Sequence, residues 1–414
     1  MRPNSGGLRY FGRIRNGTTP ASGEAEYWGG DVLWATPEDL GKLAGDSISQ
    51  TKRQVTEKAV QENNLSVLPV GSVIISTRAP IGHMAINDKP MAFNQGCRGI
   101  IPGDRVHGPF LYYLLKYRAA ELNAMANGTT FVELSRDELA AVPVEFPSLD
   151  TQQRITQFLD EKTAQIDGMI EKKRALLDRL AEKRQALITR AVTKGLNPDA
   201  PMKPSGIDWL GEMPAHWEVK RLSFVAGVID CKHRTPEYID DGVPLVSTTE
   251  IKPFTIDYST KRMVSEEELS LMSEGGRDLR LGDIVYSRNA SVGSAALIRD
   301  DRRLCLGQDL CIIRSKSVHP EYLEHFLNSG GCLEQLNREL VGATFKRVNV
   351  DVIKKYFALI PPLGEQQVIV SWLNERLDDE FGNADRVNRS LELLQEYRSA
   401  LITAAVTGQI SGLQ

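Results

Sequence analysis

Cations, amides and small hydroxyls recur together in short loop-like segments of this sequence, and these residue types can contact nucleic acid. Cationic and hydroxyl side chains bind phosphate oxygens, whereas arginine, lysine, asparagine and glutamine also pair with base edges. In the first half of the chain the candidate contacts are Asn16, Thr18, Thr19, Arg78, Gln95, Arg98 and Thr130. In the second half they are Lys232, His233, Arg234, Arg288, Asn289, Gln308, Lys346 and Arg347. We expect alanine at Arg288 to relax specificity at one base pair.

Patterns that carry catalysis or metal binding are missing from the sequence. No glycine-rich phosphate loop is found. The run Asn197-Pro198-Asp199 begins like an adenine methyltransferase motif but lacks the second proline and the aromatic residue, so it predicts a turn. His216 and His233 have no cysteine or carboxylate at metal-ligand spacing. We therefore expect no catalytic residue, no metal and no cofactor on this chain.

Composition indicates a globular protein of two or three domains. The 414 residues are 41% hydrophobic and 25% charged, and the net charge is −4. Such a balance does not indicate a nucleic-acid binder, so the cations must gather on one surface or a partner must supply them. The five cysteines form no CxxC pair, and no run approaches the roughly 18 apolar residues of a membrane helix. We expect a cytoplasmic protein without membrane contact.

The chain is a tandem duplication. Residues 186–193, Ala-Leu-Ile-Thr-Arg-Ala-Val-Thr, return 214 positions later as Ala-Leu-Ile-Thr-Ala-Ala-Val-Thr. The same shift maps Pro-Ser-Leu-Asp-Thr-Gln-Gln at 147–153 onto Pro-Pro-Leu-Gly-Glu-Gln-Gln. Near residue 73 the shift becomes 211, which a small insertion or deletion explains. The protein is therefore expected to have pseudo-twofold symmetry.

Each repeat begins with a mixed α/β part, an α+β arrangement. Residues 73–76 and 284–287 predict strands that follow a glycine, and residues 110–115 and 322–327 predict short helices. We place the two globular domains at 1–147 and 201–361 and the helical segments at 148–200 and 362–414. Apart from these matching segments, the two globular parts differ greatly in sequence.

The second part of each repeat predicts one long helix. Between residues 150 and 193 there is no proline, and apolar residues recur every eleven positions, which keeps them on one face. The first helical segment is net basic and the second is net acidic. An antiparallel pair that separates the two domains would bury both apolar stripes. The alternative is that each helix docks on its own globular domain.

Two unlike modules related by a pseudo-twofold axis suit double-stranded DNA, because symmetric readers imply two half-sites at a set spacing. Since the globular parts have diverged, the half-sites are expected to differ. The predicted target is an asymmetric, bipartite sequence with an unread gap.

Four motifs in order resemble the specificity subunits of type I restriction–modification enzymes. The segment 205–218, with Trp209 and Trp217, resembles the start of a target-recognition domain in that family. The Pro-x-Leu-x-x-Gln-Gln starts and the Ala-Leu-Ile-Thr-x-Ala-Val-Thr ends of the helices are similar to its spacer regions. The resemblance covers the whole chain, with one departure. The first repeat lacks a counterpart of the 209–217 segment, so either the start codon is placed late or this domain lacks its opening segment.

The resemblance implies a DNA sequence-specificity subunit that docks two methyltransferase subunits on its spacer helices and also joins restriction/translocase subunits. S-adenosylmethionine, ATP and magnesium are then expected on the partners. The chain would be a non-catalytic part of a restriction endonuclease and adenine DNA methyltransferase complex. Two alternatives stay open: a specificity subunit of a methylation-only or other methyltransferase system, and a coiled-coil adaptor that does not bind DNA.

Overall fold

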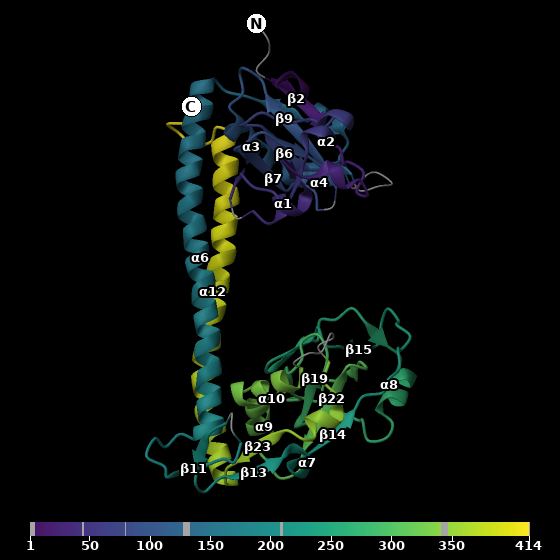
Figure 1. Ribbon diagram of the computed structural model, residues 1–414. Helices are drawn as coiled ribbons and strands as arrows, with labels where there is room; N and C mark the ends of the chain where they lie inside the picture. The colour runs from purple at the N-terminus through teal and green to yellow at the C-terminus, as the bar shows by residue number, and fades with distance from the viewer. Residues whose placement is uncertain are drawn as a thin grey trace. The chain divides into compact units, whose positions relative to one another are not determined.

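The chain folds into two compact units, each of which combines one globular part with a portion of both long helices. The computed structural model describes residues 5–413 except 44, 79, 127–132, 208–209 and 341–346. Unit 1 contains residues 1–173 and 389–414, and unit 2 contains residues 174–388 (Figure 1). Each unit is described by itself below.

Unit 1 is built on a five-stranded sheet of order β2-β9-β6-β7-β4, accompanied by a three-stranded sheet β5-β3-β8 and a pair β1-β10. The strands are β1 (Ser5–Gly7), β2 (Gly12–Asn16), β3 (Trp28–Ala35), β4 (Ser47–Ile48), β5 (Arg53–Val55), β6 (Val73–Ser76), β7 (Met84–Asn87), β8 (Met91–Phe93), β9 (Cys97–Pro102) and β10 (Pro143–Glu145). Every residue of β6 is buried, as expected for a central strand with both faces covered. The predicted strand at 73–76 is therefore confirmed.

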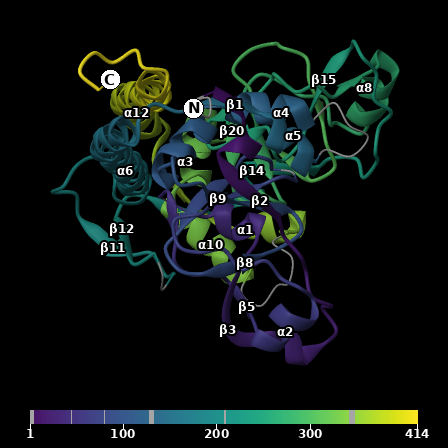
Figure 2. The same cartoon turned by 90° about the horizontal axis from the view of Figure 1, so that it is seen from above.

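Short helices cover the sheets of unit 1. They are η1 (Leu8–Tyr10), η2 (Ala25–Tyr27), α1 (Pro37–Gly41), α2 (Glu57–Glu62), α3 (Gly108–Tyr117), α4 (Ala119–Ala126) and α5 (Arg136–Ala141). The predicted helix at 110–115 lies within α3, which contributes six consecutive buried side chains from Phe110 to Leu115. Seen from above, β3, β5 and α2 form a small group at one side of the unit (Figure 2).

Unit 2 repeats this plan with its own strands. They are β11 (Met202–Pro204), β12 (Glu212–Pro214), β13 (Glu218–Arg221), β14 (Ala226–Asp230), β15 (Val243–Val246), β16 (Ile251–Lys252), β17 (Thr255–Ile256), β18 (Met263–Val264), β19 (Asp283–Ser287), β20 (Ala295–Leu297), β21 (Cys305–Leu306), β22 (Leu310–Ser315) and β23 (Phe357–Ile360). The helices are α7 (Leu222–Val225), α8 (Glu266–Ser273), α9 (Pro320–Leu327), α10 (Gly330–Leu340) and α11 (Val350–Ile353). The predicted strand at 284–287 and helix at 322–327 lie within β19 and α9.

The two globular parts share their strand order. The sheet β14-β22-β19-β20 of unit 2 matches β2-β9-β6-β7 of unit 1, and β18-β15-β21 matches β5-β3-β8. The pair β13-β23 likewise matches β1-β10. The predicted duplication is therefore confirmed in the topology as well as in the sequence. The hairpin β11-β12 adds to unit 2 ahead of this common plan.

Two long helices, α6 (Leu149–Lys194) and α12 (Leu363–Val406), follow the globular parts. In unit 1 the start of α6 and the end of α12 share one core, in which Ile155 and Leu159 lie with Ile402 and Ala405. In unit 2 the end of α6 and the start of α12 share another core. The helices therefore run antiparallel within each unit, as predicted, and they also pack on the globular parts.

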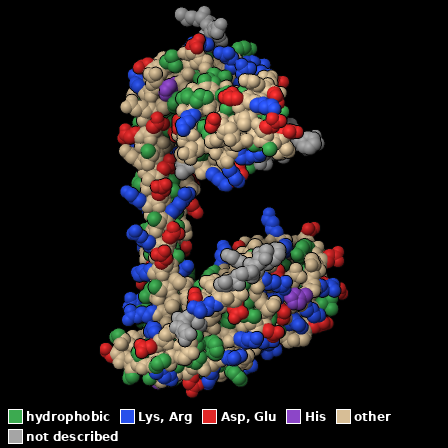
Figure 3. Space-filling view, in the orientation of Figure 1, with side chains coloured by type: hydrophobic (Ala, Val, Ile, Leu, Met, Phe, Trp, Pro, Cys, Tyr) green, Lys and Arg blue, Asp and Glu red, His purple; other side chains and the backbone are tan. Residues whose placement is uncertain are grey.

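The apolar stripe of α6 is buried only toward the helix ends. Ile155, Ile166 and Ile188 are buried, whereas Leu177 is half-buried and Ala181 is exposed. The expectation of a continuous buried stripe is thus wrong in the middle of the helix, where no globular part covers it within either unit. Acidic and basic side chains alternate along the long helices on the face drawn in Figure 3.

Candidate nucleic-acid interface

In unit 1 the candidate residues gather at one edge of the five-stranded sheet. Asn16 ends β2 and lies opposite Arg98 at the start of β9. Arg78 follows β6, the other neighbour of β9, and its backbone pairs with that of Glu133 in an isolated β-bridge. Because these strands are antiparallel, the end of β2, the start of β9 and the end of β6 lie at the same edge.

Glu133 binds both arginines at this edge. Nε of Arg78 lies 3.0 Å from Oε2 of Glu133, and Nη2 of Arg98 lies 3.1 Å from Oε1. The side chain of Arg78 remains 50% exposed, whereas that of Arg98 is only 11% exposed. Arg78 is therefore the more accessible of the two cations. Sequence reasoning missed Glu133, although the 214 shift aligns it with Arg347, another candidate.

The remaining candidates of unit 1 differ in accessibility. Asn16 and Gln95 are exposed, and Thr18 and Thr19 are half-buried. The Thr18 carbonyl accepts a hydrogen bond from the indole of Trp34 at 3.1 Å, which holds this segment against β3. A Cβ at Gly17 would lie 1.8 Å from the Asn94 carbonyl, so the segment requires glycine there. Thr130 lies outside the described residues.

Arg288 in unit 2, one of the candidate DNA contacts, is buried. Its side chain is 2% exposed, and Nη2 lies 2.7 Å from Oδ1 of Asp230. Nη2 also donates to the Gln308 carbonyl at 3.0 Å. Asp230 ends β14 as Asn16 ends β2. An ion pair between the buried Arg288 and the partly exposed Asp230 therefore occupies the edge where unit 1 presents an exposed amide, and Arg288 must break that pair before it can contact DNA.

Other cations of unit 2 also have acidic partners. Asn289 forms a bridge with Arg347, whose Nη2 lies 3.5 Å from Oδ1 of Asp309. Arg347 and Gln308 are exposed, and Asn289 is half-buried. Lys346 lies outside the described residues.

The segment 232–234 presents two cations and an imidazole, each opposite a carboxylate. Lys232 Nζ lies 2.5 Å from Glu274, and this hydrogen bond lowers the pKa of the Glu274 carboxyl. Nε2 of His233 lies 3.1 Å from Oδ2 of Asp230. Arg234 donates to both carboxylate oxygens of Glu268, at 2.7 and 3.1 Å. The charge of this segment is therefore largely balanced locally, in keeping with the net charge of −4.

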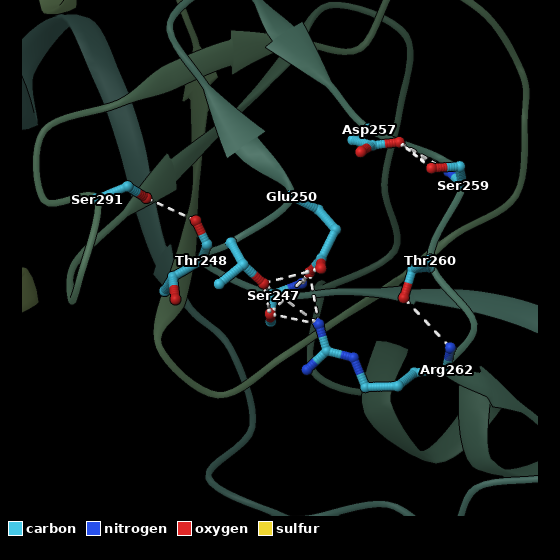
Figure 4. Close-up of polar contacts among 9 residues, drawn as sticks. Ser247, Thr248, Glu250, Asp257, Ser259, Thr260, Arg262 and Ser291 are labelled. Carbon is cyan, nitrogen blue, oxygen red and sulfur yellow. Dashed lines mark hydrogen bonds and ion pairs between the residues drawn. The ribbon is translucent and has the colours of Figure 1, made fainter. Parts of the chain in front are cut away.

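A polar groove of about 340 Å³ lies beside this segment and joins several of these residues. Its lining includes Arg234, Thr235, Ser247, Thr249, Arg262 and Gln308. Figure 4 shows the Arg262 guanidinium directed at Ser247 and Glu250. Nη2 of Arg262 donates to Oε2 of Glu250 at 2.6 Å and to Oγ of Ser247 at 2.8 Å.

Glu250 is fixed as a charged group in this network. Burial opposes its ionised form, but hydrogen bonds from the Ser247 hydroxyl and backbone N–H, with a further one from Thr249, lower the pKa of its carboxyl. A charged Glu250 in turn fixes the Arg262 head group. Sequence reasoning missed Ser247, Glu250 and Arg262. The available signal was the run Ser-Thr-Thr that precedes Glu250, because serine and threonine hydroxyls are common at the start of a turn.

Catalytic and metal sites were not expected here. Among the described residues, no group of three or more His, Cys, Asp or Glu side chains could hold a metal ion. All five cysteines are free and buried. In the same described part of the chain, no helix has the length and apolarity needed to cross a membrane.

Comparison with known proteins identifies the family. A family model described as type I restriction modification DNA specificity domain matches this chain twice, at residues 8–178 and 216–388. The chain belongs to this family. The two matches coincide with the duplicated architecture described above, so the protein is a type I specificity subunit with two target-recognition domains.

Relatives extend over nearly the whole length. The type I restriction enzyme MjaIX specificity subunit of Methanocaldococcus jannaschii is 28% identical over 97% of this chain and 92% of its own. The EcoKI specificity subunit of Escherichia coli K12 is 23% identical over 81% of this chain and 73% of its own. A chain in a solved structure on complex assembly and conformational transition of the type I R-M system has a TM-score of 0.70 at 17% identity, with 98% of both chains covered. This last likeness supports the fold.

Proposed function

We propose that this chain recognises an asymmetric, bipartite site in double-stranded DNA, with one half-site read by each unit. In this proposal it is a non-catalytic cytoplasmic subunit that docks two methyltransferase subunits on α6 and α12 and also joins restriction/translocase subunits. The partners carry S-adenosylmethionine, ATP and magnesium.

One observation carries the proposal: equivalent positions of a shared scaffold hold different chemistry. Asn16 at the end of β2 corresponds to Asp230 at the end of β14. Glu133 pairs with Arg78 in an isolated backbone β-bridge. It corresponds to Arg347, which pairs with Asn289 in the same way. A common fold with exchanged donors and acceptors suits two readers of unlike base sequences.

The balanced charges support recognition of DNA by directed hydrogen bonds more than binding by overall electrostatic attraction. The described candidates Arg78, Arg98, Arg234, Arg288 and Arg347 each lie within 3.5 Å of a carboxylate. Contact with a phosphate must then compete with an existing ion pair, which lowers the gain from counterion release. Basic partner subunits would supply the sequence-independent part of DNA affinity.

The test is selection from a randomised duplex library by the complete complex of this chain with the methyltransferase subunits encoded beside it. We expect two blocks of fixed bases separated by a random gap. Arg78→Ala is expected to alter one block and Arg347→Ala the other. A single contiguous block, or binding without base preference, would contradict the proposal. Mapping of methylated adenines in cells with and without the restriction subunit separates a restriction system from a methylation-only one.

A further inference from the structure

Arg53 in unit 1 and Arg262 in unit 2 occupy the same place in the two repeats. In unit 1, Val32 pairs with Val55, and Trp34 pairs with Arg53. In unit 2, Val243 pairs with Val264, and the Leu245 N–H donates to the Arg262 carbonyl at 2.8 Å. Both registers place the arginine two residues before a fully buried valine of the outer strand.

The positions around the two arginines agree as well. The hydroxyl of Thr51 accepts a hydrogen bond from the Trp34 N–H at 3.2 Å, and the hydroxyl of Thr260 accepts one from the Arg262 N–H at 3.2 Å. The offset between the two arginines is 209 residues, whereas the flanking motifs are offset by 211 and 214. Comparison of motifs along the sequence therefore does not align them.

The two head groups are held by different chemistry. The Arg53 guanidinium carbon lies 3.4 Å from the centroid of the Trp28 ring, and Trp28 meets Trp34 edge-on at 5.0 Å. Within the described residues the Arg53 side chain has ring contacts but no ion pair, so its N–H groups are available around the rim of the stack. Arg262 instead uses Nη2 for Glu250 and Ser247, which leaves Nε and Nη1 without a hydrogen-bond partner among the described residues (Figure 4).

We propose that Arg53 and Arg262 are matched specificity-determining residues, each of which donates hydrogen bonds to a guanine in its own half-site. Guanine presents two acceptors, O6 and N7, in the major groove, and arginine is the side chain that most often reads them. An arginine fixed by stacking or by a carboxylate loses less conformational entropy on binding. This inference rests on the proposed function and deepens it.

The surroundings of Arg262 favour a base over a phosphate. The ionised Glu250 balances the charge of Arg262 and would repel a phosphate. It also holds the guanidinium in one orientation, so that the remaining N–H donors of Arg262 stay free to bind a base. Arg53 lies beside Trp34, whose indole holds Thr18 in the candidate loop of unit 1. Arg262 lines the groove together with Gln308 and Arg234. Each arginine therefore belongs to the surface that already carries the predicted contacts of its own unit.

The sequence provides a matched control beside each arginine. Lys52 and Lys261 directly precede the two arginines and are exposed. The experiment compares Arg53→Ala, Arg262→Ala, Lys52→Ala and Lys261→Ala in the complete complex, by selection from a randomised duplex library. Thermal unfolding of each variant verifies the fold, and titration at several salt concentrations gives the number of phosphate contacts.

We expect Arg53→Ala to reduce the preference for one base by about 5- to 150-fold in one half-site, and Arg262→Ala to do so in the other. The control variants Lys52→Ala and Lys261→Ala are expected to keep every base preference. If the arginine variants instead weaken all sequences evenly and lower the salt slope by about one, the residues are phosphate contacts and the inference is wrong. If both affect the same half-site, or neither changes the selected bases, it is also wrong. A wild-type complex that selects no split site would contradict the proposed function itself.

Discussion

Oε1 of Gln152 accepts a 2.8 Å hydrogen bond from the backbone N–H of His107, and Gln366 makes the same bond to His319 at 2.8 Å. The opposite end of each amide donates to the carbonyl of the proline that precedes the helix, at 2.9 Å from Gln152 and 2.8 Å from Gln366. Each glutamine thus fastens the start of a long helix to the turn before a short helix of the globular part. This gives the repeated Pro-x-Leu-x-x-Gln-Gln motif a structural reason.

Gln152→Ala is expected to lower the free energy of unfolding by about 1–3 kcal/mol, because it leaves buried backbone groups without partners. The neighbouring Gln153 is exposed and provides the control. Gln153→Ala is expected to change stability by less than about 0.5 kcal/mol. Urea unfolding followed by circular dichroism measures both. Equal losses for the two variants would show that the tie between helix and domain contributes nothing specific.

Much of the fold could be predicted because the duplication constrains it. The repeated helix ends predicted α6 and α12 to within a few residues, and strands such as β6 and β19 were visible as apolar runs after a glycine. The burial of the helices was less predictable. An eleven-residue period marks a face, but whether Leu177 is covered depends on where the globular parts end, which is a property of tertiary packing.

The candidate site was harder to predict because charge pairing is not local in sequence. Arg78 and Glu133 are 55 residues apart, and Arg288 and Asp230 are also distant. A list of cations therefore named residues that the fold gathers at one edge of the sheet in unit 1, but it did not show which side chains stay accessible. Arg262 was missed because its offset differs from that of the motifs on either side.

Arg288→Ala is expected to destabilise unit 2 by about 1–3 kcal/mol, because it removes a buried side chain and leaves the partly exposed Asp230 carboxylate without its arginine partner. Arg347→Ala provides a contrast, since that side chain is 45% exposed and its pair with Asp309 is long. It is expected to cost less than about 1 kcal/mol. Thermal unfolding of both variants gives the comparison. If Arg288→Ala keeps wild-type stability and instead changes the selected bases, Arg288 leaves its ion pair to read DNA.

Arg398→Ala is expected to weaken the pairing of the long helices in unit 1 by about 1 kcal/mol. Its guanidinium binds both carboxylate oxygens of Asp167, at 2.9 and 3.2 Å, and both side chains are partly exposed. The exchange Asp167→Arg with Arg398→Asp is expected to restore part of the loss. A double-mutant cycle from urea unfolding measures the coupling, and a coupling of zero would make this ion pair irrelevant to helix pairing.

His325 makes the stability of unit 2 depend on pH. The imidazole is 2% exposed, and burial lowers its pKa from 6.5 to about 4. It stays neutral in the folded state while the unfolded chain takes up a proton below pH 6.5. The free energy of unfolding is therefore not reduced by His325 above pH 6.5. As the pH falls from 6.5 toward 4 it decreases by roughly 3 kcal/mol, because only the unfolded chain takes up the proton. The buried Glu324 has a raised pKa and acts in the opposite direction, because its stabilising effect declines as the pH rises.

His325→Gln keeps Glu324 and Arg299 in place, so the difference in slope from wild type isolates the histidine. Glutamine can also retain the contact to Asn374, which lies 3.3 Å from Nε2 of His325. We expect the free energy of unfolding of the variant to fall less steeply between pH 6.5 and 4. Parallel pH profiles for wild type and His325→Gln would show that the buried imidazole is protonated as readily in the folded state as in the unfolded chain.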